Sequence, residues 1–179
     1  MLVDYYQIKS SKELQAYLDK YIALVKNVAG TFDVNLTEAR FKCDHLGMQV
    51  LSSDEFDQVS ELLSKYSKVT RDNIIHDRRN RIFQFNTAFN IAGIEIPRIE
   101  IFEPKPNADS KTLKLGIEHI SFKVEDYDEF LSKFEKQGHP IDKKGVFDDG
   151  SKFFKTMFVN VVELEFRNDF LGVGPRYQS

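Results

Sequence analysis

The heptapeptide Asp44-His45-Leu46-Gly47-Met48-Gln49-Val50 recurs 74 residues later as Glu118-His119-Ile120-Ser121-Phe122-Lys123-Val124. Each copy begins with an acid and a histidine, and its apolar residues then occupy alternate positions, which is the period of a half-buried β-strand. At the same offset, Asp54-Glu55-Phe56 recurs as Asp128-Glu129-Phe130. The sequence therefore predicts an internal repeat in which a strand leads into a helix.

Further signals extend both copies in the same order. Ser52 and Asp126 precede the two helices as expected N-caps, each with a glutamate three positions later. Segments rich in Phe, Val and Ile follow the helices, and these expected strands cover residues 81–90, 98–102, 152–160 and 161–166. The copies end alike, with Ile99-Glu100-Ile101 in the first and Leu164-Glu165-Phe166 in the second. We therefore expect each copy to be a β-α-β-β-β module.

A capped helix precedes the repeat. Ser10-Ser11-Lys12-Glu13 is a capping box, and apolar residues follow it at helical spacing. We expect residues 1–40 to form an N-terminal helical extension packed on the core, 41–106 the first module, and 107–179 the second module plus a C-terminal tail. The expected fold class is α+β, in which the paired modules form a curled sheet around a polar cavity. A dimerisation helix is the alternative role of the extension, so we expect a monomer or a homodimer.

Composition excludes several classes of function. The 179 residues carry a formal net charge of −3, which gives no electrostatic basis for binding nucleic acid or an anionic membrane. No apolar run approaches the roughly 18 residues of a membrane span, and the N-terminus lacks the pattern of a signal peptide. The single Cys43 cannot form an internal disulfide. We expect a cytoplasmic protein in which Cys43 is a small buried residue on the strand face of His45.

Strand alternation predicts a polar face that carries the titratable residues of the repeat. In the first and last strands of each module, apolar side chains point one way and polar side chains the other. If the two sheets curl toward each other, their polar faces enclose a cavity, and its expected lining is His45, Gln49, Arg98, Glu100, His119, Lys123, Glu163, Glu165 and Arg167. Buried imidazoles and carboxylates need salt bridges, water or a metal ion. Two imidazoles and two carboxylates with open coordination positions suit a divalent Zn, Ni, Mn, Co or Fe ion and do not suit Ca.

At these residues the sequence resembles the vicinal oxygen chelate superfamily, which includes glyoxalases, bleomycin-resistance proteins and extradiol dioxygenases. Within it, most of the chain resembles the YecM-like family of uncharacterised bacterial proteins. The resemblance is carried by Asp44-His45-Leu46, Ile99-Glu100-Ile101, Gly116-Ile117-Glu118-His119-Ile120 and Leu164-Glu165-Phe166. It implies paired β-α-β-β-β modules and a divalent metal ion held by the first and last strand of each. Carried over residue by residue, the implied ligands are His45, Glu100, His119 and Glu165.

Glu163 shares its expected strand face with Glu165, and its role stays open. It could replace Glu165 as a ligand, act as a general base, or form a salt bridge with Arg167. The residues expected to move a proton in catalysis are Glu100, Glu163 and Glu165. The residues expected to bind an anionic substrate are Gln49, Arg98, Lys123 and Arg167. For the three cations among them, internal ion pairing with the glutamates is the alternative.

The leading functional hypothesis is a divalent-metal-dependent enzyme of the vicinal oxygen chelate type. It would act as an isomerase or a lyase on a small anionic substrate, or on one with two neighbouring oxygens, by stabilising the oxyanion that forms. The rival hypothesis is a non-catalytic protein that binds or sequesters a small molecule in the same cavity without metal. A third is a structural or partner-docking protein with an inert cavity.

Overall fold

The computed structural model describes residues 10–75, 77–106, 116–147, 150–158 and 162–171. The first part of this region consists of α1 (Ser11–Gly30), β1 (Phe41–Gln49), α2 (Ser53–Ser64), β2 (Ser67–Ile75), β3 (Arg78–Ile91) and β4 (Ile94–Phe102). The second consists of β5 (Gly116–Val124), α3 (Tyr127–Lys136), β6 (Lys143–Val146), β7 (Lys152–Phe158) and β8 (Val162–Arg167). After α1, the order β-α-β-β-β therefore occurs twice, and we call these the first unit and the second unit.

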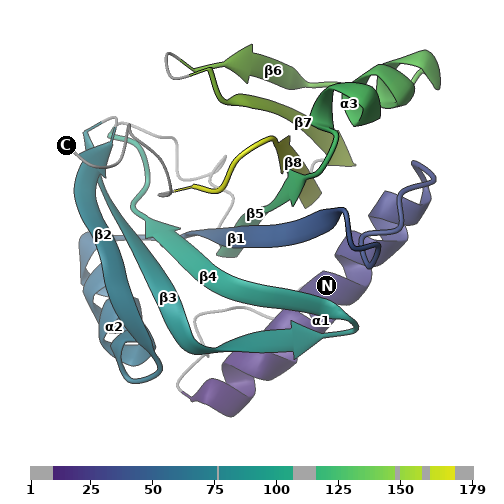
Figure 1. The fold of residues 1–179 in the computed structure, drawn as a ribbon. Helices are drawn as coiled ribbons and strands as arrows, with labels where there is room; N and C mark the ends of the chain where they lie inside the picture. The colour runs from purple at the N-terminus through teal and green to yellow at the C-terminus, as the bar shows by residue number, and fades with distance from the viewer. Residues whose placement is uncertain (1–9, 76, 107–115, 148–149, 159–161, 172–179) are drawn as a thin grey trace.

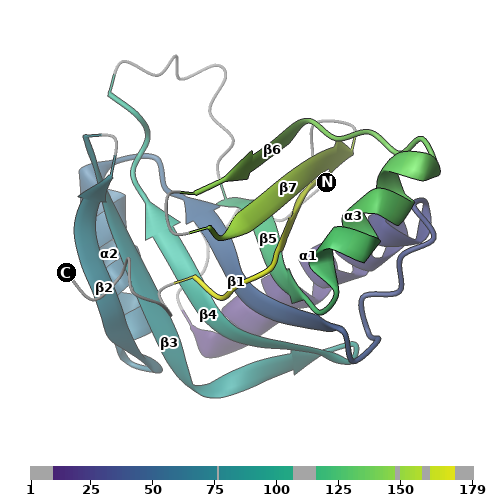
Figure 2. The ribbon, with the colours of Figure 1, turned by 45° about the horizontal axis from the view of Figure 1, so that its top comes forward.

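All the strands belong to one 8-stranded sheet in the order β2-β3-β4-β1-β5-β8-β7-β6. The units meet at its centre, where β1 pairs with β5 in antiparallel fashion, and within each unit the first strand pairs with the last in parallel. The sheet curls without closing into a barrel (Figures 1 and 2). This architecture confirms the expected α+β class and the curled sheet formed by two paired modules.

The helices lie on the outer face of the curled sheet, and α1 runs diagonally beneath its centre (Figure 1). The amide of Glu13 donates to the Ser10 hydroxyl at the start of α1, as the capping box predicts. The buried face of α1 consists of Leu14, Tyr17, Leu18, Tyr21, Ile22, Val25, Val28 and Ala29. Each large apolar side chain buried in this way contributes about 1.5–3 kcal/mol to the free energy of unfolding. No helix in the described ranges is both long and apolar enough to cross a membrane.

The other two helices differ in how they begin. Ser52 caps α2 by accepting from the amide of Glu55, as predicted. Asp126 does not cap α3: its backbone is left-handed, with φ 55°, and its side chain makes no cap hydrogen bond. The N-terminal boundary of α3 is therefore right, but the expected capping interaction is wrong. Phe130 and Phe134 hold α3 on the sheet through ring contacts with Phe154 of β7, at centroid distances of 5.7 and 5.2 Å.

Two β-bulges interrupt the central strand pair, one in each heptapeptide. Cys43 pairs with Phe122 and His45 with Ser121, so Asp44 is an extra residue in β1. Gly47 pairs with His119 and Met48 with Ile117, so Glu118 is an extra residue in β5. A bulge shifts the alternation of side chains by one position. For this reason Cys43 joins the hydrophobic core together with Leu46, and its expected placement on the face of His45 is wrong.

Candidate metal centre

Strand register brings the histidines and glutamates of both units onto the middle of the curled sheet. His45 of β1 is the partner of Ser121, and Ser121 is the partner of Glu165 on β8. Gly47 is the partner of both His119 on β5 and Glu100 on β4. In each unit, therefore, the glutamate of the last strand pairs with the residue two positions after the histidine, which is Gly47 in the first unit and Ser121 in the second. By this register Glu165, and not Glu163, occupies the position that corresponds to Glu100.

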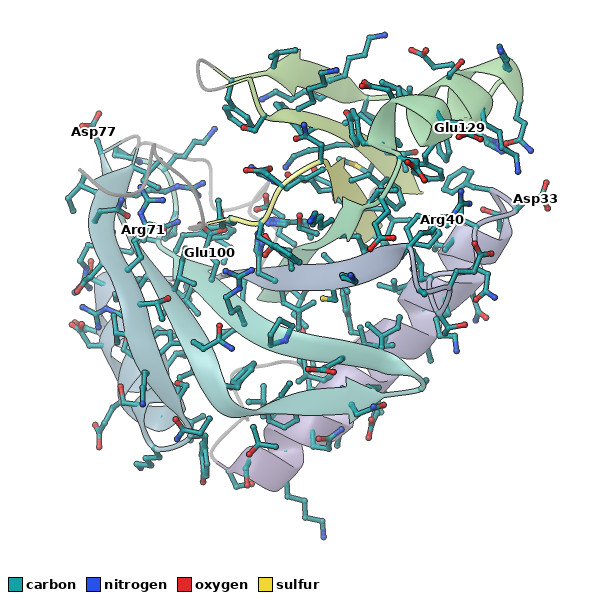
Figure 3. All side chains as sticks on the ribbon, in the orientation of Figure 1. Asp33, Arg40, Arg71, Asp77, Glu100 and Glu129 are labelled. Carbon is teal, nitrogen blue, oxygen red and sulfur yellow. The ribbon has the colours of Figure 1, made fainter. Side chains whose placement is uncertain are left out.

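Three of the predicted ligands converge on one point. The Nε2 atoms of His45 and His119 are 3.1 Å apart, and Oε2 of Glu100 lies 3.7 and 3.9 Å from them. A point equidistant from these three atoms lies about 2.1 Å from each, which matches zinc–nitrogen and zinc–carboxylate bond lengths. All three side chains are at most slightly exposed. The group fits a divalent first-row metal ion and would leave further coordination positions to water or substrate. Glu100 is labelled in Figure 3, near the end of β4.

Gly47 makes room for this arrangement. A Cβ atom built on Gly47 would lie 2.0 Å from Cε1 of the His119 ring and 2.4 Å from its Nε2. The His119 ring therefore lies directly over the Gly47 backbone, where no other residue type leaves space for it. The ring also stacks on Phe102, with centroids 6.2 Å apart and planes 14° apart.

Asp44, the bulged residue of β1, orients His45. Its Oδ2 accepts from Nδ1 of His45 at 2.9 Å and from the Leu171 amide at 2.9 Å, and its Oδ1 accepts from the Arg98 guanidinium. Burial alone would lower the pKa of His45, but the hydrogen bond to Asp44 and nearby carboxylates outweigh it and raise that pKa. A carboxylate behind a metal-binding histidine fixes the tautomer in which Nε2 faces the metal.

His119 has different surroundings. Burial, followed by the positive charges of Lys155 and His45, lowers the pKa of His119 to about 3. Its Nδ1 is a buried atom without a hydrogen-bond partner among the described residues. A neutral imidazole is the form that binds metal ions, so His119 is ready to bind one at neutral pH.

The two corresponding glutamates differ in their partners. Oε1 of Glu100 accepts from the Asn80 amide at 2.7 Å, and its Oε2 faces the imidazoles. Oε1 of Glu165 accepts from Arg167 at 3.1 Å and from the Ser121 hydroxyl at 3.2 Å, while Oε2 lies 3.0 Å from Nζ of Lys155. Burial would raise the pKa of Glu165, but Lys155, His119 and Arg167 together hold it well below its usual range.

A cavity of about 310 Å³ opens over these side chains. Its lining consists of His45, Ile75, Arg78, Asn80, Glu100, Phe102, Glu118, His119, Lys143, Phe147, Phe153, Lys155, Glu165, Arg167 and Leu171. Carboxylates and imidazoles meet in it with four cationic side chains. Such a cavity has the size and chemistry to bind a small anionic molecule.

The structure separates the predicted substrate-binding residues. Arg167 lines the cavity, whereas Arg98, Lys123 and Gln49 are not among its lining residues. Arg98 is held by Asp44 and by the carbonyl of Leu171, at 2.6 Å from the latter. The Lys123 ammonium lies 4.8 Å from the ring centroid of Phe170, and Gln49 is buried.

Glu163 is bound to Nζ of Lys155 at 2.6 Å and reaches the cavity only through that lysine. With Glu118 and His119 it also forms a second group whose possible ligand atoms lie within 4.8 Å of one another. The ion pair with Lys155 already neutralises one member of this group, which favours the group of His45, His119 and Glu100 as the metal centre.

Sequence reasoning missed three residues that shape the site. Asp44 is visible as the acid before His45, but its orientation depends on a bulge that alternation does not reveal. Lys155 lies on β7 and Asn80 on β3, which are inner strands of the sheet. Alternation along these strands does not by itself show which of their faces points toward the cavity. The pairing of Lys155 with Glu165 follows once β7 is placed antiparallel to β8.

Solved structures of the same architecture place this fold in a known class. A protein described as "Structural Genomics, Protein EC4020" matches with a TM-score of 0.71 and 12% identity, over 96% of this chain and 94% of its own. A methylmalonyl-CoA epimerase in complex with methylmalonyl-CoA and NH4+ matches with a TM-score of 0.52 and 16% identity, over 72% and 94%. A Streptomyces coelicolor methylmalonyl-CoA epimerase variant bound to 2-nitronate-propionyl-CoA gives 0.53 and 16%, over 76% and 100%. The fold is that of the vicinal oxygen chelate superfamily.

The family model named "YecM protein" matches residues 10–144. This chain therefore belongs to the YecM family, as the sequence resemblance indicated. No curated protein matches it in sequence.

Proposed function

We propose that this protein is a divalent-metal-dependent enzyme of the vicinal oxygen chelate type, an isomerase or a lyase acting on a small anionic substrate with two neighbouring oxygens. The observation that carries the proposal is the convergence of His45, His119 and Glu100 in a cavity lined by cations. These three residues would hold a Zn, Ni, Mn, Co or Fe ion. When bound, the ion would polarise the oxygens of the substrate as a Lewis acid.

The carboxylates of the cavity supply groups that can move a proton. Glu100 and Glu165 both line the cavity, so either can reach a bound substrate. Lys155 and Arg167 keep Glu165 ionised and weaken it as a base. Glu100 would be bound to the metal ion, which weakens it as a base too, so both carboxylates are candidate proton acceptors. Glu163 would act on a substrate through the Lys155 ammonium to which it is bonded.

A non-catalytic binding protein is the second candidate function, and one observation favours it. Arg78, Lys143, Lys155 and Arg167 line the cavity together, and cations in this number can bind an anion without a metal ion. The two candidates differ in one requirement: only the enzyme needs a metal ion for its action.

The test is proton exchange in D2O. Small 2-oxo and 2-hydroxy acids are incubated with metal-free protein and with protein loaded with each of the five metals. Loss of the C3–H signal of the 2-oxo acids and of the C2–H signal of the 2-hydroxy acids is followed by NMR. Metal-dependent exchange supports the enzyme. Binding of these acids by metal-free protein, with no exchange under any metal, would contradict it and favour the binding protein.

A further inference from the structure

The two corresponding glutamates have different neighbours, and Lys155 is the residue that distinguishes them. We propose that Lys155 keeps Glu165 out of the metal centre, so that three side chains bind the ion, and that Lys155 also binds the anionic group of the substrate. This inference rests on the proposed function, because it assumes a metal ion held by His45, His119 and Glu100. It departs from the four-ligand set that the sequence resemblance implies.

The contacts of Glu165 occupy both of its carboxylate oxygens. Ser121 and Arg167 donate to Oε1, and Lys155 donates to Oε2. Glu100, in contrast, binds Asn80 with Oε1 and points Oε2 at the two imidazoles. To reach the metal, Glu165 would have to give up its charge-assisted hydrogen bond to Lys155, which would then keep Glu163 as its one carboxylate partner among the described residues.

Lys155 is placed to serve the substrate as well. Its ammonium carries three donors, and Glu163 at 2.6 Å and Glu165 at 3.0 Å account for two of them. The side chain lines the cavity and is 21% exposed. The two carboxylates therefore hold the ammonium in a fixed position and leave its third donor for an incoming anion.

Two of the other predicted cations, Arg98 and Lys123, do not compete for this role. Arg98 donates to Asp44 and to the carbonyl of Leu171, and neither Arg98 nor Lys123 lines the cavity. Arg167 lines the cavity, and its guanidinium, like the Lys155 ammonium, is paired with two carboxylates, Glu165 and Asp169. Arg78 and Lys143 line the cavity as well, and Lys155 is the cation that Glu163 and Glu165 hold together for a small carboxylate or phosphate.

The first experiment measures the Kd of Co²⁺ in the wild type and in variants of the two glutamates. Replacing a ligand costs more than replacing a neighbour of the ligands, so Glu100→Gln should weaken binding by more than about 100-fold and Glu165→Gln by less than about tenfold. Equal losses in the two variants would overturn the proposal. A wild type that binds no Co²⁺ would overturn both this inference and the proposed function, whereas equal losses leave the proposed function intact.

The second experiment separates ligation from charge. Lys155→Met should tighten Co²⁺ binding by about tenfold or more, because the freed Glu165 can become a fourth ligand and a nearby positive charge is lost. In a Glu165→Gln background the ligation part of this gain should vanish. If the same gain remains in that background, charge alone explains it and the proposal is wrong. Lys152→Met is the matched control, since Lys152 lies on the same strand and pairs with Asp128 on the surface.

The third experiment uses oxalate, a small dianion with neighbouring oxygens, as the probe. Co²⁺-loaded Lys155→Met protein should bind oxalate at least about tenfold more weakly than the loaded wild type, while Lys152→Met protein binds it normally. Unchanged oxalate binding in Lys155→Met would overturn the assignment of Lys155 to the substrate. Circular dichroism confirms the fold of each variant, and if Lys155→Met does not fold, Lys155→Gln replaces it and is expected to weaken oxalate binding to a similar extent.

Discussion

The first and second units share the same strand pattern, but the histidine and the glutamate of this pattern have different neighbours in the two units. Each unit has a histidine on its first strand and a glutamate on its last, at corresponding register. In the first unit Asp44 bonds to the histidine and a neutral amide bonds to the glutamate. In the second unit Nδ1 of the histidine has no partner among the described residues, and two cations hold the glutamate. The strand pattern thus brings the histidines and glutamates together, and the neighbouring side chains give them different contacts.

The corresponding positions Gly47 and Ser121 illustrate this difference. Gly47 lies under the imidazole of the opposite unit and carries no side chain because none would fit. Ser121, opposite His45, instead uses its hydroxyl to hold Glu165. One position creates space for the His119 imidazole, and the other restrains a carboxylate.

The largest effect is expected from Gly47→Ala. The new methyl group would overlap the His119 ring and displace it, so metal binding should be lost, and overpacking should lower the free energy of unfolding by about 1–3 kcal/mol. Metal titration and denaturant unfolding measure the two effects. Ser121→Ala is the counterpart in the second unit and should leave metal binding in place, with a stability loss of about 1 kcal/mol. Equal loss of metal binding in both variants would contradict the account.

Asp44→Asn is expected to have the next largest effect. The amide cannot stabilise the His45 tautomer as a carboxylate does, so metal affinity should fall by about 10–100-fold. The pKa of His45, followed by NMR, should fall as well, because the hydrogen bond and the negative charge of Asp44 raise it. A purely structural effect of the substitution would not lower this pKa. Glu118→Gln, the corresponding change in the second unit, should lower metal affinity less. A larger loss in Glu118→Gln than in Asp44→Asn would reverse the assignment.

The pH dependence of metal binding should follow His45 and not His119. The pKa of His45 is raised above the ordinary histidine value of 6.5, so this residue gains its second proton at a higher pH than an ordinary histidine. Metal ions must displace that proton, and affinity should therefore fall as the pH drops below the raised pKa. His119, with a pKa of about 3, stays neutral over this range. Titrations of metal affinity that show a midpoint only near pH 3 would contradict this expectation.

The smallest effect is expected from Lys123→Ala. Strand alternation predicts a substrate-binding role for Lys123, but its ammonium lies over the Phe170 ring and outside the cavity lining. Oxalate binding by the metal-loaded variant should match that of the wild type, and the stability loss should be about 0.5–1 kcal/mol. A marked loss of oxalate binding would show that the cavity extends to Lys123.

Much of the fold could be predicted because the repeat and strand alternation are local signals. The heptapeptides predicted the positions of β1 and β5, and the segments around Glu100 and Glu165 predicted those of β4 and β8. Edge strand β2 carried no clear signal, since exposed residues such as Val69 and Ile74 do not follow the burial pattern of an inner strand. The cap of α3 failed because Asp126 adopts a left-handed backbone conformation.

The site was predictable only as far as strand register alone determines it. Register brings His45, His119 and Glu100 together, and these three residues were all named from the sequence. The contacts of Arg98 and Lys155 depend on a β-bulge, a C-terminal segment and an inner strand that are distant in sequence. Whether a charged residue faces the cavity or forms an internal ion pair depends on such long-range side-chain partners. A single sequence does not reveal these partners.

Elemental analysis of the purified protein and of its His45→Ala and His119→Ala variants shows whether both units contribute to one metal centre. One metal centre shared by both units predicts near-stoichiometric divalent metal in the wild type and its loss in each variant, because each unit contributes one imidazole. Metal retained in both single variants, or none bound by wild-type protein after incubation with Zn, Ni, Mn, Co or Fe, would show that His45 and His119 do not share a metal ion.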